Sequence, residues 1–188
     1  MRIISGSARG RKLAEFKGSG IRPTPDRARE ALFSILTSRS GSLNGARVLE
    51  LFAGSGALSL EALSRGADRA LLVDSSPQAI ALIRENIARC RMEAQTEVLR
   101  QPADKALSQL DNRSPFDLIF MDPPYNKGHI PRILGSIATL QLLAQNGIIA
   151  AESATGEQID LPEGLRLIES RRYGSSEIHL IERDTALD

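Results

Sequence analysis

The sequence predicts an α/β fold of three layers, in which helices cover both faces of a mostly parallel sheet. Short apolar runs alternate with helical patterns through the middle of the chain, and nearly every position of these runs is apolar, as in strands buried on both faces. Two further strand patterns, separated by a turn that contains glycine, end the chain and predict an antiparallel hairpin. We therefore expect seven strands in all. A length of 188 residues suits one domain of this kind.

Composition limits the class of protein further. The single cysteine, Cys90, excludes a disulfide within the chain, and the widely separated His129 and His179 lack the spacing of a metal site. No apolar run is long enough to span a membrane, and the N-terminus lacks the apolar stretch of a signal peptide. We expect a cytoplasmic protein without a metal, and one compact domain favours a monomer.

Charge is distributed unevenly along the chain. Residues 1–39 hold nine Lys or Arg against three Asp or Glu, whereas the rest holds fifteen against twenty, so the net charge of +1 conceals a basic segment on a mildly acidic body. This asymmetry indicates a polyanionic partner such as nucleic acid, although a solvated basic tail gives the same pattern. We expect a basic N-terminal arm and helix over residues 1–40 and a main domain over residues 41–188.

The first helix is expected over residues 25–38. Thr24 can cap it, Pro25 suits its first position, and Asp26 meets its positive end. Arg27 and Arg29 lie off its apolar stripe, which comprises Ala28, Ala31, Leu32, Ile35 and Leu36. Strands are expected at 46–52, 70–74, 96–99, 116–121, 147–152, 165–170 and 177–182, with the hairpin turn at 171–176. The other helices are expected at 58–65, from Ser76 and Pro77 onward, near 103–110 and at 129–144.

The first motif that suggests chemistry is Glu50-Leu51-Phe52-Ala53-Gly54-Ser55-Gly56, at a strand-to-helix turn. Its glycines allow a tight turn and a close approach of a ligand to the main chain. The third glycine of a dinucleotide fingerprint is replaced by Ser59, so pyrophosphate binding is disfavoured. The acidic Glu50 favours a ligand that carries positive charge. A plain tight turn is the simpler alternative.

The second motif is Asp74, which ends the next strand, twenty residues after Gly54. A carboxylate at this place can accept hydrogen bonds from both hydroxyls of a ribose. Ser76 already supplies the helix cap, so Asp74 is available for a ligand. Together these residues indicate an adenosine pocket, and they leave a nicotinamide cofactor and S-adenosylmethionine as alternatives.

The third motif, Asp122-Pro123-Pro124-Tyr125, follows an apolar strand. The prolines stiffen the chain and remove two backbone donors, which leaves carbonyl acceptors beside the Asp122 carboxylate. Two acceptors that hold the hydrogens of an exocyclic amine would free its lone pair for attack, and Tyr125 offers a flat face for stacking a base. This motif favours S-adenosylmethionine over nicotinamide. A loop that is merely stiffened by proline is the alternative.

These three motifs resemble those of class I S-adenosylmethionine-dependent methyltransferases that act on amino nitrogens, which have a Rossmann-like fold. Residues 2–13 and 22–33 are similar to the opening of the bacterial 16S rRNA guanine-N2 methyltransferases, and the resemblance extends to about residue 182. It implies direct in-line transfer of a methyl group to N2 of the guanine at position 966 of small-subunit rRNA. The partner would be 16S rRNA in the small ribosomal subunit or in an assembly intermediate.

The resemblance also implies a role for individual residues. The catalytic residues would be Asp122, Pro123 and Tyr125. The S-adenosylmethionine site would comprise Glu50, Phe52, Ala53, Gly54, Ser55, Gly56, Asp74, Ser75 and Asp104, with Asp104 beside the adenine. Phosphates of the RNA would contact the basic residues Arg9, Arg11, Lys12, Arg22, Arg27 and Arg29.

Other classes of protein share some of these sequence features. An amino-methyltransferase that acts on DNA adenine or cytosine, or on another RNA, shares the chemistry, but the DNA enzymes usually carry a further target-recognition domain. A protein glutamine methyltransferase typically begins the third motif with Asn rather than with Asp122. A nicotinamide oxidoreductase lacks support without the third glycine, and a non-catalytic RNA-binding module has no use for both Asp74 and Asp122 at strand ends.

Overall fold

The computed structural model describes residues 1–16, 26–110 and 114–184. Seven strands in this part of the chain form one sheet in the spatial order β3-β2-β1-β4-β5-β7-β6. Strands β1 to β5 run parallel to one another, and β7 pairs antiparallel with both β5 and β6. The strands are β1 (Arg47–Leu51), β2 (Arg69–Asp74), β3 (Thr96–Arg100), β4 (Phe116–Met121), β5 (Leu143–Ala154), β6 (Leu165–Tyr173) and β7 (Ser176–Arg183). The predicted mostly parallel sheet of seven strands with a C-terminal antiparallel hairpin is confirmed.

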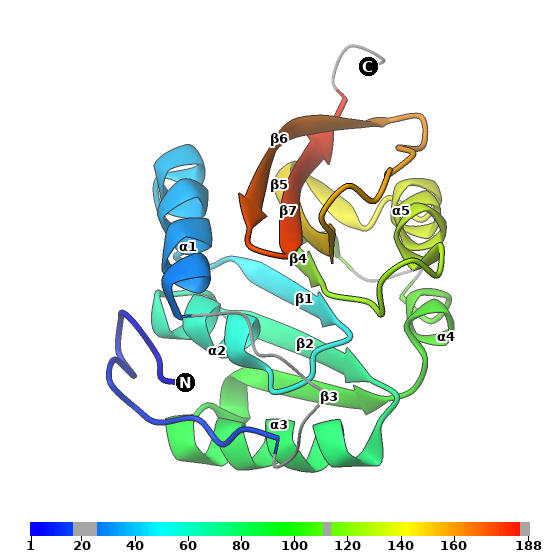
Figure 1. Cartoon of the computed structure of the whole chain (residues 1–188). Coiled ribbons are helices and arrows are strands. Elements are labelled where there is room, and N and C mark those ends of the chain that lie inside the picture. Colours follow the sequence, from blue (N-terminus) through cyan, green and yellow to red (C-terminus); the bar gives the residue numbers. More distant parts are fainter. Residues whose placement is uncertain (17–25, 111–113, 185–188) are drawn as a thin grey trace.

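Helices cover both faces of this sheet (Figure 1). They are α1 (Asp26–Ser40), α2 (Ala57–Ser64), α3 (Pro77–Cys90), α4 (Ala103–Leu107) and α5 (His129–Thr139), with a 3-10 turn at Glu93–Gln95. Helices α1, α2 and α3 pack on one face and α4 and α5 on the other, over two separate apolar cores. Neighbouring strand residues such as Ile119 and Phe120 belong to opposite cores, as the alternation of a strand requires. No helix of the described residues is both long and apolar enough to cross a membrane.

The predicted start of α3 is confirmed at atomic detail. The Ser76 hydroxyl accepts a hydrogen bond from the backbone N–H of Ala79, and Pro77 occupies the first helical position. This cap fixes the point at which the chain leaves β2 and enters α3. The residues expected to cap α1, Thr24 and Pro25, lie outside the described residues.

Several predicted boundaries differ from the structure by a few residues; strand β5, for example, begins at Leu143 rather than at 147, and α4 ends at Leu107 rather than near 110. Helix α5 ends at Thr139 rather than near 144, because Gln141 takes a left-handed conformation (φ 50°) and Leu143 already pairs with Phe116 of β4. Strand β6 runs to Tyr173, so the hairpin turn is shorter than the predicted 171–176. The reason is that Arg171 and Arg172 pair across the sheet with β7.

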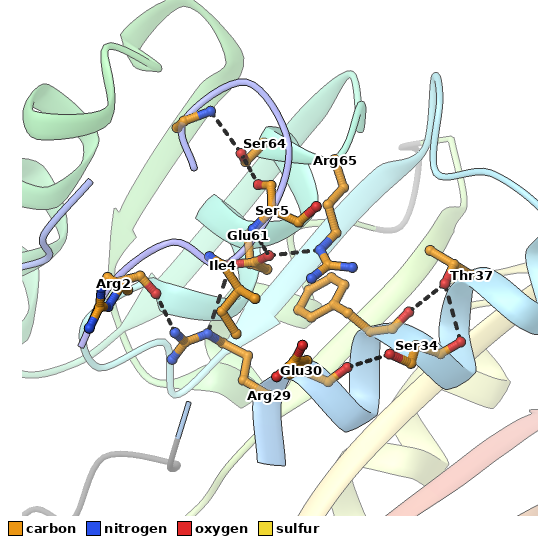
Figure 2. Close-up of polar contacts among 12 residues, drawn as sticks. Arg2, Ile4, Ser5, Arg29, Glu30, Ser34, Thr37, Glu61, Ser64 and Arg65 are labelled. Carbon is orange, nitrogen blue, oxygen red and sulfur yellow. Dashed lines mark hydrogen bonds and ion pairs between the residues drawn. The ribbon is translucent and has the colours of Figure 1, made fainter. Parts of the chain in front are cut away.

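The N-terminal arm, residues 1–16, packs against α2 and α3 and contributes to the core. Ile3 and Leu13 are buried in the same apolar cluster as the three helices on that face. The buried Glu61 carboxylate of α2 accepts hydrogen bonds from the backbone N–H groups of Ile4 (2.7 Å) and Ser5 (3.0 Å), as Figure 2 shows. The arm is therefore held by buried polar contacts as well as by apolar packing.

Arg29 belongs to this same cluster, and its predicted contact with RNA phosphates is wrong. Its side chain is only 1% exposed; it donates to the carbonyl of Arg2 (2.5 Å) and lies 4.0 Å from the Glu61 carboxylate (Figure 2). The buried face of α1 also includes Leu32 and Phe33, one turn further along, so Arg29 lies on the inner side of the helix. The buried Arg29 side chain therefore connects α1 to the arm and to α2.

Candidate active site at the carboxyl ends of the strands

The loops that carry the three predicted motifs meet at one edge of the sheet. Glu50 lies near the end of β1, Asp74 ends β2, and Asp122 directly follows β4. Because these strands are parallel, their carboxyl ends lie together, which is where α/β sheets bind ligands. The structure thus brings the predicted cofactor and catalytic motifs together, and we refer to this edge as the rim.

The loop between β1 and α2 is a tight turn. Phe52, Gly54 and Gly56 all have positive φ (57°, 56° and 73°), and the backbone N–H of Ala53 donates to the carbonyl of Val73 on β2. A side chain at Gly56 would collide with Leu72, so this glycine lets α2 pack closely. A Cβ at Gly54 would meet only the carbonyl of Phe52, at 3.9 Å, so the outer side of this loop is open to a ligand.

The Asp74 carboxylate holds this loop in place. One oxygen accepts a hydrogen bond from the N–H of Gly54 (2.9 Å) and the other from the N–H of Ser76 (2.8 Å). An ionised carboxylate has about four acceptor sites, so the half-buried Asp74 can still accept hydroxyl groups of a ligand. Its neighbour Ser75 is exposed at the same rim.

Glu50 is a buried acid beneath the loop. One carboxylate oxygen accepts a hydrogen bond from the N–H of Ser59 in the first turn of α2 (2.9 Å). Burial raises the pKa of Glu50 to about 7, an effect that its hydrogen bonds with Ser59 and Leu58 oppose and the charge of Asp74 strengthens. A nearby positive charge would stabilise the ionised form of this acid.

Asp122 lies at the exposed side of the rim, opposite a residue that the sequence analysis did not single out, Glu152 of β5. Met121 pairs with Ala151, so the two acids are neighbours on adjacent strands. Loss of water around the carboxyl raises the pKa of Asp122 to about 7, and the charges of Glu152 and Glu50 add to this effect. The sequence signal that could have indicated Glu152 is its position as an acid at the end of an apolar run that begins at Ile148.

Tyr125 is tied to Glu152. Its hydroxyl donates a hydrogen bond to Oε1 of Glu152 (2.9 Å), and the Ser176 side chain of β7 also hydrogen-bonds to it. Partial burial, followed by the charges of Glu152 and Asp122, raises the pKa of the Tyr125 phenol well above its usual range. The residue as a whole is 38% exposed, so part of its flat side chain remains available beside Asp122.

Asp104 reaches the rim from the first turn of α4. Its carboxylate forms an ion pair with Arg132 of α5 (2.8 Å), and Arg132 also contacts Nδ1 of His129 (3.1 Å). The His129 ring packs at 5.6 Å, between ring centres, from that of Phe52 in the glycine loop. A row of contacting side chains therefore connects the glycine loop to Asp104. His129 therefore has a structural contact in this row, between Phe52 and Arg132.

Those predicted RNA-binding residues of the arm that the structure describes, Arg9, Arg11 and Lys12, are not gathered at the rim. Arg9, Arg11 and Lys12 lie where the arm passes the carboxyl ends of α2 and α3: Ser7 N–H donates to the carbonyl of Ser64, and Arg11 donates to the carbonyl of Arg89. In Figure 1 the arm turns at the left, whereas the arrows of β1, β2 and β3 point to the right. Arg27 is exposed on the first turn of α1. Arg22 lies outside the described residues.

Comparison with known proteins provides evidence about the family of this chain that is independent of the geometry of the rim. A family model described as "Conserved hypothetical protein 95" matches residues 1–182. "Ribosomal RNA small subunit methyltransferase D" of Haemophilus influenzae is 32% identical to this chain, over 93% of this chain and 89% of the relative. The protein of the same name from Escherichia coli K12 is 36% identical, over 88% of this chain and 77% of the relative. The chain belongs to this methyltransferase family.

A solved structure supports the same assignment. "Putative methyltransferase yhhF" of Escherichia coli superposes with a TM-score of 0.82, at 33% identity and over 98% of each chain. The predicted family and the class I methyltransferase fold are thereby confirmed. The roles of single residues at the rim remain predictions.

Proposed function

We propose that the protein transfers a methyl group from S-adenosylmethionine to the exocyclic N2 of a guanine, at position 966, in 16S rRNA of the small ribosomal subunit. The observation that carries this proposal is the set of acids on adjacent strands at the rim, Glu50, Asp122 and Glu152, beside a rigid Asp-Pro-Pro-Tyr segment. An acidic rim suits a cationic cofactor and an amine substrate. The relatives named for small-subunit rRNA support the choice of RNA.

The residues present fit this cofactor. S-adenosylmethionine supplies a methyl group on a positively charged sulfur, which is a good leaving group. Glu50, with the open side of Gly54, suits the charged methionine end, and Asp74 suits the ribose. Phe52, Ala53, Ser55, Gly56 and Ser75 would line the rest of this site, and Asp104 would lie by the adenine.

Asp122 and the carbonyl of Pro123 would hold the amine of the base. The lone pair of such an amine is delocalised into the ring, so two acceptors that hold its hydrogens favour a geometry in which nitrogen can attack in line. Tyr125 would stack on the base, and its hydrogen bond with Glu152 fixes the ring. The proton becomes acidic once nitrogen is methylated, and either Asp122, with a pKa of about 7, or solvent would accept it.

The RNA must present the guanine outside the base stack, which a loop or bulge allows. Residues 1–40 would serve as the RNA-binding extension of a methyltransferase domain at 41–188, with Arg9, Arg11, Lys12, Arg22 and Arg27 near phosphates. These basic residues attract RNA and make binding dependent on salt. We expect the protein to act as a monomer in the cytoplasm, on the small subunit or an assembly intermediate.

Labelled S-adenosylmethionine tests the proposal. The protein is offered unmethylated small subunits, naked small-subunit rRNA, DNA and mixed protein, and labelled RNA is digested to nucleosides. We expect label in N2-methylguanosine from rRNA. Label in DNA or in protein would retain the cofactor but overturn the substrate, and absence of label from every sample would contradict the proposal.

A further inference from the structure

Glu152 is an acid at the rim to which the proposed chemistry gives no contact with the substrate. Because β4 and β5 pair in register, Glu152 follows Ala151 just as Asp122 follows Met121. Phe120 and Ala150, two residues earlier on each strand, both belong to the core beneath α1, α2 and α3. Strand alternation therefore directs Glu152 to this face of the sheet, and Asp122, one residue beyond β4, follows the paired residue Met121 beside it.

The Glu152 carboxylate also lies at the edge of the stacking ring. Its Oε1 accepts the hydrogen bond of the Tyr125 hydroxyl at 2.9 Å, and Ser176 approaches the same hydroxyl from β7. A base stacked on the half-exposed Tyr125 would present its edge to the acids around that ring. Among the described residues, Asp122 and Glu152 are the acids whose charges act on the Tyr125 hydroxyl, so a base held by Asp122 would have Glu152 beside it.

The edge of guanine matches two neighbouring carboxylates. Guanine carries two adjacent donors, the N2 amine and the N1–H, whereas adenine has a bare lone pair at N1. An ionised carboxylate accepts hydrogen bonds and cannot donate them, so it attracts N1–H and repels a lone pair. A carboxylate at this place would therefore favour one base and reject the other.

We infer that Glu152 is a specificity residue that accepts a hydrogen bond from N1–H of the target guanine while Asp122 and the Pro123 carbonyl hold the N2 amine. The inference rests on the proposed function and assigns the choice of base to β5. Tyr125 adjoins both groups, because its ring would stack on the base while its hydroxyl is hydrogen-bonded to the carboxylate that would recognise the base edge.

The test uses small-subunit rRNA made by ligation with either guanine or 2-aminopurine at the target position. 2-Aminopurine keeps the amine at C2, which would receive the methyl group, but it has a lone pair at N1 in place of N1–H. The wild-type protein is expected to prefer guanine in kcat/KM by about 10- to 100-fold, the effect of one hydrogen bond to a charged group. In Glu152→Gln the amide can donate to N1, so this preference should fall to near unity or reverse.

Tyr125→Phe is the matched variant. It removes the hydrogen bond to Glu152 but keeps the ring, so it should lower transfer to both RNAs and leave their ratio near that of the wild type. A ratio unchanged in Glu152→Gln would overturn the inference, and so would an equal loss of preference in Tyr125→Phe, since Glu152 would then act only by holding the ring. A wild-type protein that methylates neither RNA would instead overturn the proposed function. Thermal melting and cofactor affinity of each variant show whether it is folded.

Discussion

Two acids at the rim, Glu50 and Asp122, have pKa values raised to about 7, in both cases chiefly by loss of water around the carboxyl group. Glu50 is buried beneath the glycine loop, whereas Asp122 lies at the exposed rim beside Glu152. The ionised carboxylate is the stronger hydrogen-bond acceptor, and only the ionised form attracts a cation. The charge of the site therefore changes close to neutral pH.

This property predicts the pH dependence of transfer. Below pH 7 the protonated form of Asp122 dominates, so fewer molecules can accept both hydrogens of the amine, and kcat/KM should rise as pH increases through about 7. Initial rates between pH 5.5 and 9 measure this rise. Glu152→Gln removes a neighbouring negative charge and should move the midpoint to lower pH. A midpoint below pH 5 in the wild type would contradict the assignment.

Glu50 also affects the stability of the fold. Its pKa in the folded state is raised above the ordinary value of 4.5, so the folded protein keeps a proton that the unfolded chain releases between about pH 4.5 and 7. The free energy of unfolding must therefore fall as pH rises through this window. Glu50→Gln should be more stable than the wild type at pH 8, by a margin that shrinks towards pH 4.5. Urea denaturation at both pH values measures this difference in the free energy of unfolding. Glu85 is exposed on α3, so Glu85→Gln is a control whose stability should change little at either pH.

At the scale of elements, Asn86 of α3 connects the N-terminal arm to the glycine loop. Its buried amide exchanges hydrogen bonds with the backbone of Ala14 (2.6 and 3.1 Å) and donates to the carbonyl of Ser55 (3.0 Å). Nothing in the sequence singled out this residue, because its partners are backbone groups of two segments that only the fold brings together. One side chain thus holds a predicted cofactor loop against a predicted RNA-binding arm.

Asn86→Ala should cost about 2 kcal/mol of stability, because buried backbone groups lose their partners, and should weaken cofactor binding by loosening the loop. Calorimetry and denaturation check both effects. Arg84→Ala, on the exposed side of the same helix, should leave both quantities near the wild-type values. Unchanged cofactor affinity in Asn86→Ala would show that the loop keeps its shape without this contact.

The elements also show what a sequence can predict. Apolar runs that end in Asp74 and in Asp122 predicted the rim, because parallel strands place their carboxyl ends together. Arg29 was wrongly placed at the surface, because its burial depends on acceptors from the arm and α2 that lie far away in the sequence. Glu152 was missed for the same reason, since its partner Tyr125 is 27 residues away.

On the scale of the whole molecule, Arg11 and Lys12 of the arm contact Arg89 at the carboxyl end of α3, whereas Asp74 of the rim contacts Ser76 at its amino end. This helix has 14 residues and a length of about 20 Å. RNA that contacts Arg11 and Lys12 while its guanine enters the rim would have to run along this side of the domain. The arm would then contribute to binding of the RNA and not to the chemical step.

The triple variant of Arg9, Arg11 and Lys12 to Ala tests this separation. It should raise KM for rRNA about tenfold or more at moderate salt and make the dependence of log K on log salt less steep by about 2, with kcat unchanged. Arg166→Ala, on the far edge strand β6, is a control that removes one exposed cation elsewhere. A fall in kcat at unchanged KM would place the arm's effect in the chemical step.

The central claim is that the rim methylates the N2 amine of a guanine, and one comparison tests it most directly. The wild-type protein and the Asp122→Asn variant are first shown to bind S-adenosylmethionine with equal affinity. Each is then given unmethylated small subunits, and the rRNA nucleosides are analysed by mass spectrometry. We predict N2-methylguanosine at one position with the wild type and a rate lower by about 10²–10³-fold with the variant. Methylation of another atom or base, or equal rates for the two proteins, would contradict this account.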